Sequence, residues 1–296
     1  DVSDRQNIQL HWIRIEDVPA IWERLDASGL HSLEACGDSP RPFLGSPVAG
    51  VAVDEIIDGS SALAEIERRY IGNPDFANFP RKFKTALTGH PSHDVAPEIN
   101  DVAFVGTVHP EHGPGFDLWV GGGLSTNPML AQKMGVWIPL DEVPDAWEAV
   151  ASIFRDYGYR RLRSRARLKF LVQDWGIEKF REVVEKEYLG RSLVSNPSPE
   201  TPLGHRDHIG VHDQVDGRKY VGIAPTAGRV SGTLLVELAD LMDEYAVQGA
   251  RLTPYQKIVL IGVEPAVVEA LLDRLDEIGL SGRPSGWRRN TMACTG

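Results

Sequence analysis

Two lysines that lie two residues apart are the first candidates for chemistry in this chain. Lys82 and Lys84 occur in the segment FPRKFKTALTG, whose pattern favours a strand over a solvated helix. Alternate side chains of a strand share a face, so both ammonium groups should point to one place, and Arg81 and Phe83 to the other side. Two cations aimed at one place predict an anion site. The alternative is an edge strand that lysines protect from aggregation.

A run of cations is the second candidate. The segment YRRLRSRARLKF contains no Asp or Glu. On a helix, Arg163 and Arg167 would share a face. On a strand, the odd-numbered positions from 161 to 169 would share one. Guanidinium groups pair with carboxylates or phosphates through two parallel hydrogen bonds. The run predicts either a groove for a multiply charged anion or a solvated face, and its cations are Arg160, Arg161, Arg163, Arg165, Arg167 and Lys169.

Glycines and histidines supply weaker signals. Gly121 to Gly123 end an apolar strand in LWVGGGLSTNP, where glycine lets the backbone approach a ligand closely. Without a GxGxxG motif or a Walker lysine, a large flat cofactor fits as well as a phosphate. Two histidine pairs have a spacing that zinc uses, but flanking prolines and glycines indicate loops and disfavour zinc. These pairs are His90 with His93 and His109 with His112.

Composition limits the class of protein. With 296 residues the chain is long enough for about two domains. A formal net charge of −11 argues against general nucleic-acid binding. No apolar run is long enough to predict a membrane span. The two cysteines, Cys36 and Cys294, exclude a disulfide framework and favour a reducing compartment, which predicts the cytoplasm.

A repeated strand–helix unit must position part of these residues. The first copy is a strand in DRQNIQLHWIRI and a helix in VPAIWERLDASGL, with Ile21, Trp22 and Leu25 expected on the buried side. A near-copy begins 250 residues later, and each copy leads into a loop that contains Ala-Cys. An internal duplication explains these matches. The matching pairs include Gln6 and Gln256, Ile8 and Ile258, Leu10 and Leu260, and Gly29 and Gly279.

The residues between the copies predict an α+β fold, because strands and helices alternate only loosely. Strands are expected at 50–57, 81–89, 101–109, 116–125 and 218–232, and helices at 142–158, 177–189 and 233–246. The segment 195–207 is rich in proline and serine and is the best internal boundary. The chain opens inside a strand pattern without methionine and stops two residues after Cys294, so we expect a piece of a longer protein.

Six segments together resemble one family. In chain order they are RQNIQLHW, PRKFKTALTG, INDVAFVG, LWVGGGLSTNP, RLRSRARLKF and NTMAC. They resemble the sirohaem-containing sulfite and nitrite reductases, most closely the actinobacterial ferredoxin-dependent branch. The resemblance implies a duplicated α+β fold with ferredoxin-like half-domains and a mixed-sheet sirohaem domain. The implied parts are 1–33 (end of the first half-domain), 34–194 (sirohaem domain), 195–284 (second half-domain) and 285–296 (start of a second sirohaem and 4Fe–4S domain).

The resemblance also assigns cofactors and residues. It implies one sirohaem and one 4Fe–4S cluster, with Cys294 as the first cluster ligand and the others outside this chain. Arg41, Lys82 and Lys84 match cations around the substrate, and Cys36 matches a cysteine near the haem. Sirohaem has eight carboxylates, and buried charges require partners, which would explain the acid-free run. The remaining positions implied to hold sirohaem are Arg5, Gln9, His11, Arg81, Arg163, Arg165, Arg167, Lys169 and Gln256.

The implied activity is six-electron reduction of sulfite to sulfide, with electrons from ferredoxin. Reduction of nitrite to ammonia is the second hypothesis, and Cys36 in EACGDSPR favours sulfite. A module that binds anions or nucleic acid without catalysis would also use the cations at 160–169, but net acidity disfavours nucleic acid. A degenerate duplicate that keeps the fold without cofactors is disfavoured because Lys82 and Lys84 are both present.

Overall fold

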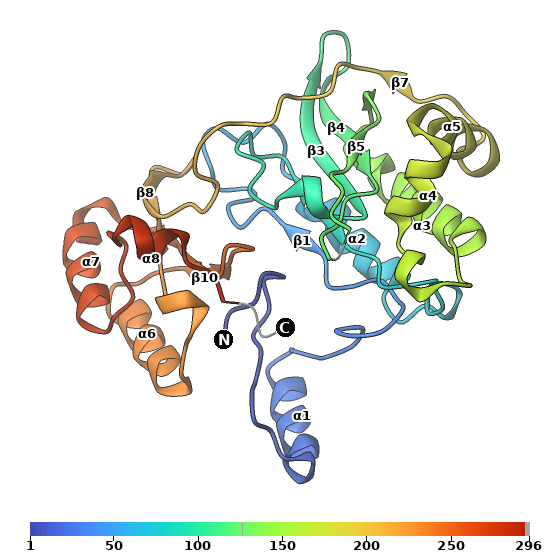
Figure 1. The fold of residues 1–296 in the computed structure, drawn as a ribbon. Coiled ribbons are helices and arrows are strands. Elements are labelled where there is room, and N and C mark those ends of the chain that lie inside the picture. The colour runs from blue at the N-terminus through green and yellow to red at the C-terminus, as the bar shows by residue number, and fades with distance from the viewer. Residues whose placement is uncertain (126, 294–296) are drawn as a thin grey trace.

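The computed structural model describes residues 1–125 and 127–293 and confirms the α+β class (Figure 1). The helices are α1 (Val18–Ala27), α2 (Ser60–Tyr70), α3 (Val143–Tyr157), α4 (Leu168–Trp175), α5 (Ile177–Val183), α6 (Gly232–Glu244), α7 (Val268–Glu277) and α8 (Gly286–Asn290). The strands are β1 (Leu44–Gly45), β2 (Thr85–Thr88), β3 (Val102–His109), β4 (Gly113–Val120), β5 (Gln132–Lys133), β6 (Val136–Trp137), β7 (Val194–Ser195), β8 (Gly210–Asp213), β9 (Lys219–Ile223), β10 (Gly249–Leu252) and β11 (Ile258–Val263).

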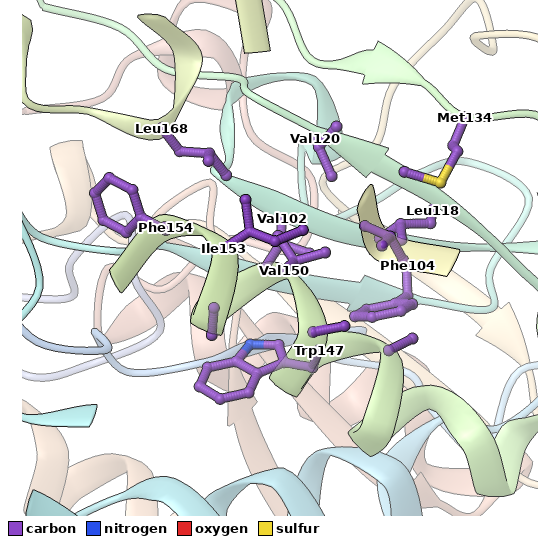
Figure 2. Close-up of a cluster of buried hydrophobic side chains, with 14 of the residues drawn as sticks. Val102, Phe104, Leu118, Val120, Met134, Trp147, Val150, Ile153, Phe154 and Leu168 are labelled. Carbon is purple, nitrogen blue, oxygen red and sulfur yellow. The ribbon is translucent and has the colours of Figure 1, made fainter. Parts of the chain in front are cut away.

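A mixed five-stranded sheet organises the larger unit. Its order is β1-β2-β3-β4-β5, with β1, β2 and β3 parallel and the later pairs antiparallel. The apolar side of α3 packs on this sheet, and Figure 2 shows Trp147, Val150 and Ile153 of the helix among side chains of β3 and β4. The burial of these side chains is the main driving force for this unit. No helix in the described ranges is long and apolar enough to cross a membrane.

The second unit is a four-stranded antiparallel sheet, in the order β10-β11-β9-β8. Side chains from β9, β11, α6 and α7 form its core. A small cluster joins the two units, since Val48 and Ala52 of the larger one pack with Tyr220 and Val259 of this sheet. The two units therefore share a buried boundary.

The two copies of the repeat have matching backbone turns. Gln6 and Gln256 both have a positive φ, of 55° and 58°, which is uncommon outside glycine. Ser3 and Thr253 begin these turns, and the hydroxyl of each accepts from the backbone N–H groups two and four residues later. Duplication of the unit is thus confirmed by its geometry.

The first copy nevertheless lacks the predicted strand. Residues 9–13 form no ladder in the described chain, and only an isolated Val2–Ile8 bridge is present. The helix forms as predicted at α1, but it buries none of its residues, and Trp22 is 53% exposed. The physical reason is that β11 of the second copy lies between β9 and β10, whereas residues 1–15 have no such neighbours among the described residues. Figure 1 shows α1 projecting away from both units.

Three further predictions of local structure were wrong. Residues 50–57 form turns and not a strand. Their contact with the second unit is an isolated bridge between Ala52 and Gln214, and one bridge does not make a ladder. Lys82 and Lys84 precede β2, which begins at Thr85. The arginine run is neither a continuous helix nor a strand, since Arg163–Arg165 is a short 3₁₀ turn before α4. The side chains at alternate positions of the run therefore do not share one face, as they would on a strand.

Candidate functional site

A buried phenylalanine directs the two lysines to a common side. Phe83 is fully buried, and its ring stacks on Phe154 of α3 at a centroid distance of 5.6 Å. Lys82 and Lys84, on either side of it, are both only half-buried. The alternation expected of an extended chain is therefore present, although the lysines lie just before the strand. Packing of one aromatic ring thus determines where both ammonium groups point.

Backbone contacts fix the position of Lys84. Its N–H donates to Asp101 Oδ2 at 2.8 Å, and its carbonyl accepts from Val102 N at 3.1 Å. The next residue is held from the other side, since the Trp147 indole donates to the Thr85 hydroxyl at 2.8 Å. These contacts anchor the lysines to β3 and α3, so their positions are set by rigid elements.

The lysines lie among other cations. Burial lowers the pKa of Lys84 to about 8, and the nearby charges of Arg5, Lys82 and Arg167 act in the same direction. Burial also lowers the pKa of Lys82, together with the charges of Arg167, Arg41 and Arg81. These like charges add to the effect of burial, so positive charge converges on the two lysines, and Asp4 and Asp101 offset part of it. We call these six residues, Arg5, Arg41, Arg81, Lys82, Lys84 and Arg167, the cationic cluster.

Arg5 reaches the cluster from the first copy of the repeat. Its guanidinium donates to Asn100 Oδ1 at 2.7 Å and to the carbonyl oxygens of Pro42 and Thr85 at 2.6 and 3.1 Å. Burial lowers its pKa to about 10. Its Nε atom is buried without a hydrogen-bond partner in the described chain. A buried donor without a partner is costly, so an anionic acceptor at this place would be stabilising.

Arg167 and Lys169 lie beside the glycine segment. Arg167 donates two hydrogen bonds to the buried Asp101, at 2.8 and 3.1 Å. Lys169 is buried, and its ammonium donates to the carbonyl oxygens of Gly123, Leu124 and Asn127. A Cβ atom on Gly123 would lie 3.0 Å from the Arg167 guanidinium. The absence of a side chain at this position lets the backbone approach the cations closely.

The other arginines of the run lie further out. Arg163 is exposed and forms a double hydrogen bond with Asp38, which holds the pKa of that carboxyl below its ordinary value. Arg165 is exposed, and its guanidinium lies 3.9 Å from a carboxylate oxygen of Asp174. Three cations of the acid-free run therefore lie near carboxylates outside it. Arg163 and Arg167 pair with Asp38 and Asp101 on distant segments, and Arg165 lies near Asp174 of the following helix, α4. Their pairing with cofactor carboxylates remains a prediction.

Arg41 and Cys36 lie on one exposed loop. The Arg41 guanidinium donates to the carbonyl oxygens of Ala35 and Gly37, and lies 3.9 Å from the Cys36 sulfur. Cys36 is a free, exposed thiol. The charge of Arg41 acts on Lys82, Arg5 and Asp38, so the loop borders the cationic cluster.

Three further predicted residues lie on the two copies of the repeat. Gln9 and His11 are exposed on the first copy, where one His11 ring nitrogen lies 3.3 Å from Asp1. Gln256 is buried in the second unit, and its amide exchanges two hydrogen bonds with the backbone of Ala293. The predicted cluster ligand, Cys294, lies outside the described residues.

Sequence reasoning missed two residues that hold the site together. Asp101 binds Arg167 and the backbone of Lys84, and Asn100 accepts from Arg5. Both lie immediately before β3 in the segment INDVAFVG, and this position at the start of a buried strand was the available signal. Their importance depends on chain segments far away in sequence, which the local pattern does not contain.

Comparison with known proteins agrees with this geometry. The family model described as "Nitrite and sulphite reductase 4Fe-4S domain" matches residues 36–193. The model "Nitrite/Sulfite reductase ferredoxin-like half domain" matches residues 1–28 and 212–278. The chain belongs to the nitrite and sulphite reductase family. The predicted family is thereby confirmed, and the two half-domain matches coincide with the two copies of the repeat.

Individual relatives support the same assignment. The chain is 61% identical over 297 residues to "Sulfite reductase [ferredoxin]" of Mycobacterium tuberculosis, covering 100% of this chain and 53% of that protein. It is 36% identical over 314 residues to "Assimilatory ferredoxin-dependent nitrite reductase" of Haloferax mediterranei, again covering 100% and 53%. The solved structure of M. tuberculosis NirA superposes with a TM-score of 0.96 at 60% identity, covering 100% and 54%. The chain spans about half the length of the curated relatives it matches.

Proposed function

We propose that the whole protein reduces sulfite to sulfide at a sirohaem coupled to a 4Fe–4S cluster, with ferredoxin as the electron donor. The observation that supports this proposal most directly is the convergence of the cationic cluster in a chain of formal net charge −11. Further support comes from the relatives named ferredoxin sulfite reductase, which are 61% identical over the whole chain.

The residues present fit a large group with many carboxylates. The unpartnered Arg5 Nε atom is a donor that such a group could satisfy. The glycine segment leaves room beside Arg167, because a Cβ on Gly123 would crowd its guanidinium. We propose that Arg5, Arg81 and Arg167 pair with carboxylates of the sirohaem. The remaining predicted cofactor contacts are Gln9, His11, Cys36, Arg163, Arg165, Lys169 and Gln256.

When bound, the sirohaem would supply the metal and the electrons for breaking sulfur–oxygen bonds, and the cluster would feed it single electrons. The chain itself must bind the oxyanion and deliver protons. Lys82 and Lys84 project to the same side, so both ammonium groups can donate to one small anion, and Arg41 borders them. Positive charge fixed in place before the anion arrives stabilises the negative charge that develops during reduction.

Lys84 is suited to proton donation. A group with a pKa of about 8 is mostly protonated at pH 7, and gives up its proton more easily than an ordinary lysine. As pH rises through about 8, the free site loses this charge, so affinity for the oxyanion should fall. Binding of an anion raises the lysine pKa again, since opposite charge favours the ammonium form.

Substitution of the lysines in the complete, cofactor-loaded enzyme tests this role. Lys82→Ala or Lys84→Ala should each lower kcat for sulfite about 100-fold or more, the usual cost of removing one fixed donor. Lys186→Ala is the matched control, because Lys186 is exposed and forms its ion pair with Glu182, one helical turn away. Turnover within about twofold of the unsubstituted enzyme in both variants would reject the proposed role of the cationic cluster.

Nitrite reduction to ammonia is the second candidate function. Relatives at 36–37% identity are named ferredoxin-dependent nitrite reductases. The higher identity to sulfite reductases and the presence of Cys36 favour sulfite. A comparison of kcat/KM for the two anions with reduced ferredoxin decides between them. A larger value for nitrite would reverse the order.

We also propose ferredoxin as the protein partner and the cytoplasm as the location. Support for the partner comes from the names of the relatives, and support for a reducing compartment comes from a chain with only two cysteines. Electron transfer from reduced ferredoxin to the complete enzyme, followed in a stopped-flow spectrophotometer, tests the partner. Failure of ferredoxin to reduce the loaded enzyme would contradict it.

A further inference from the structure

A second group of chemically active side chains lies at the boundary between the two sheets, apart from the cationic cluster. One ligand atom from each of His90, Asp94 and His208 lies within 4.8 Å of the other two, and all three residues are buried. His90 and Asp94 belong to the loop after β2, and His208 lies two residues before β8. The spacing of His90 and His93 therefore misled the sequence analysis, because the partner of His90 comes from the other unit.

We propose that His90, Asp94 and His208 bind one divalent transition-metal ion, for which zinc is the best match, at the joint between the two units. Two imidazoles and a carboxylate form a donor set that zinc uses with one position left open. Zinc ligands lie about 2.0–2.2 Å from the metal, so atoms on neighbouring corners are roughly 3.5 Å apart. The observed separations lie around this value, at 2.8 Å between His208 Nε2 and Asp94 Oδ2 and no more than 4.8 Å for any pair.

The residues around the three ligands support this interpretation. The Asp94 carboxylate accepts from the Thr88 and Ser46 hydroxyls, at 2.7 Å each. The His90 ring is held by Ser92, whose hydroxyl lies 2.8 Å from Nδ1. Metal ligands are usually oriented by a second layer of hydrogen bonds of this kind. The His208 ring has the Tyr220 hydroxyl 3.4 Å from its Nδ1 atom. Each of the three ligand side chains therefore has a polar neighbour that orients it before any ion binds.

The contact between His208 and Asp94 identifies where the metal enters. Nε2 of His208 lies 2.8 Å from Asp94 Oδ2, so in the metal-free chain the imidazole donates a proton to the carboxylate. A metal ion can take the place of that hydrogen between the two atoms, while the imidazole proton moves to Nδ1, where the Tyr220 hydroxyl can accept its hydrogen bond. The exchange moves the proton from one ring nitrogen to the other, so the imidazole stays neutral and no proton is released.

A cavity gives the ion access and supplies further donors. It has a volume of about 560 Å³ and is lined by His90 and His208, and by Asp54, His205 and His212. Four of the nine histidines of the chain thus surround one cavity. The fourth metal position would face this space and hold water or a small ligand. Arg289 also lines the cavity, but its guanidinium is paired with Asp207 at 2.6 and 2.7 Å, so its repulsion of a cation is reduced.

Metal analysis of the complete protein, purified with its own cofactors, tests the proposal. After dialysis against a chelator, titration with zinc chloride should load about one zinc per chain, measured by mass spectrometry that separates zinc from iron. The melting temperature should rise with zinc concentration, because the ion binds only the folded joint. His90→Gln and His208→Gln should each weaken zinc binding at least about tenfold.

His109→Gln is the matched control. His109 and His112 form an exposed stacked pair at the tip of the β3–β4 hairpin, which is a competing place for zinc. The control should retain full zinc binding. Loss of zinc in His109→Gln with retention in His90→Gln would overturn the proposal, and so would less than about 0.1 zinc per chain at saturating zinc.

A measurement on the unsubstituted protein guards against variants that fail to fold. Cobalt(II) added to the chelator-treated protein should give the strong visible bands of a four-coordinate ion. Weak bands of a six-coordinate ion would contradict buried coordination by His208 and Asp94. None of these readouts depends on sulfite reduction, so the metal site and the proposed activity can fail separately.

Discussion

The two copies of the repeat share matching residues and turns but have very different surroundings. In the second copy, α7 buries Val268, Leu271, Leu272 and Leu275 against the four-stranded sheet. In the first copy, α1 buries none of its residues. Both helices form at matching positions, so local sequence is sufficient to specify the helix. Burial depends on neighbouring strands, which the described chain supplies only to the second copy.

The copies also differ in what they contribute to the site. Arg5 of the first copy corresponds to Tyr255 of the second. Arg5 reaches into the cationic cluster, whereas Tyr255 is a half-buried phenol whose pKa burial raises to about 12. The same turn geometry thus presents a permanent cation in one copy and a neutral group in the other. Duplication preserved the scaffold and allowed one copy to specialise in binding negative charge.

The largest expected difference between the copies concerns matched leucines. Leu275→Ala in this chain should lower the free energy of unfolding by about 2–5 kcal/mol, because Leu275 is fully buried. Leu25→Ala, at the matching position of α1, should cost less than about 1 kcal/mol, because Leu25 is only half-buried and α1 buries none of its residues. Urea denaturation followed by circular dichroism measures both. Equal losses would show that α1 is packed against another surface in solution.

The matched glutamines should behave alike. The Gln6 amide exchanges hydrogen bonds with Gly45 N and O, at 3.1 and 2.8 Å, as the Gln256 amide does with Ala293. Gln6→Ala and Gln256→Ala should each cost about 1–3 kcal/mol, since each leaves backbone groups unpaired. The same denaturation experiment applies. A loss in only one variant would mean that the shared turn is stabilised differently in the two copies.

The smallest expected effect concerns the matched turn residues Trp12 and Gly262, which both have positive φ, of 59° and 73°. Gly262→Ala should destabilise by roughly 1–3 kcal/mol, because its Cβ would also lie 2.4 Å from the Gln248 side chain. Trp12→Gly should change stability by less than about 1 kcal/mol, since Trp12 is fully exposed and glycine tolerates this conformation. Thermal melts compare the two. A large loss for Trp12→Gly would contradict its exposure.

Local periodicity and internal symmetry predicted much of the fold. The helices α1, α3 and α6 and the strands β3 and β4 occur where apolar patterning indicated them, and the duplication is visible in matched turns. The expected strands at residues 4–15 and 50–57 were wrong, because a strand needs a partner that its own sequence does not specify. Pairing is a long-range property, whereas helix hydrogen bonds are local.

Only part of the site was predicted, because its local features are visible in the sequence and its long-range contacts are not. The placement of Lys82 and Lys84 near one another agrees with alternation about the buried Phe83, since the charge of Lys82 acts on Lys84. Arg81, which was expected on the opposite side, also acts on Lys82, so alternation does not describe its position. The partners of the arginine run were not predictable, because Asp38, Asp101 and Asp174 come from three separate segments. The histidine cluster was missed since His90 and His208 are 118 positions apart in the sequence and meet only at the boundary between the units.

The most direct test of the central claim, that positive charge converges on Lys84, is the ammonium pKa of this residue. Amine labelling of the chain across pH, with each lysine resolved by mass spectrometry, should give a midpoint of about 8 for Lys84, well below the ordinary 10.5. Lys186, whose pKa is raised by its hydrogen bond with Glu182, is the internal control. Arg5→Met should raise the Lys84 midpoint. A Lys84 midpoint at or above 10.5 would contradict the account.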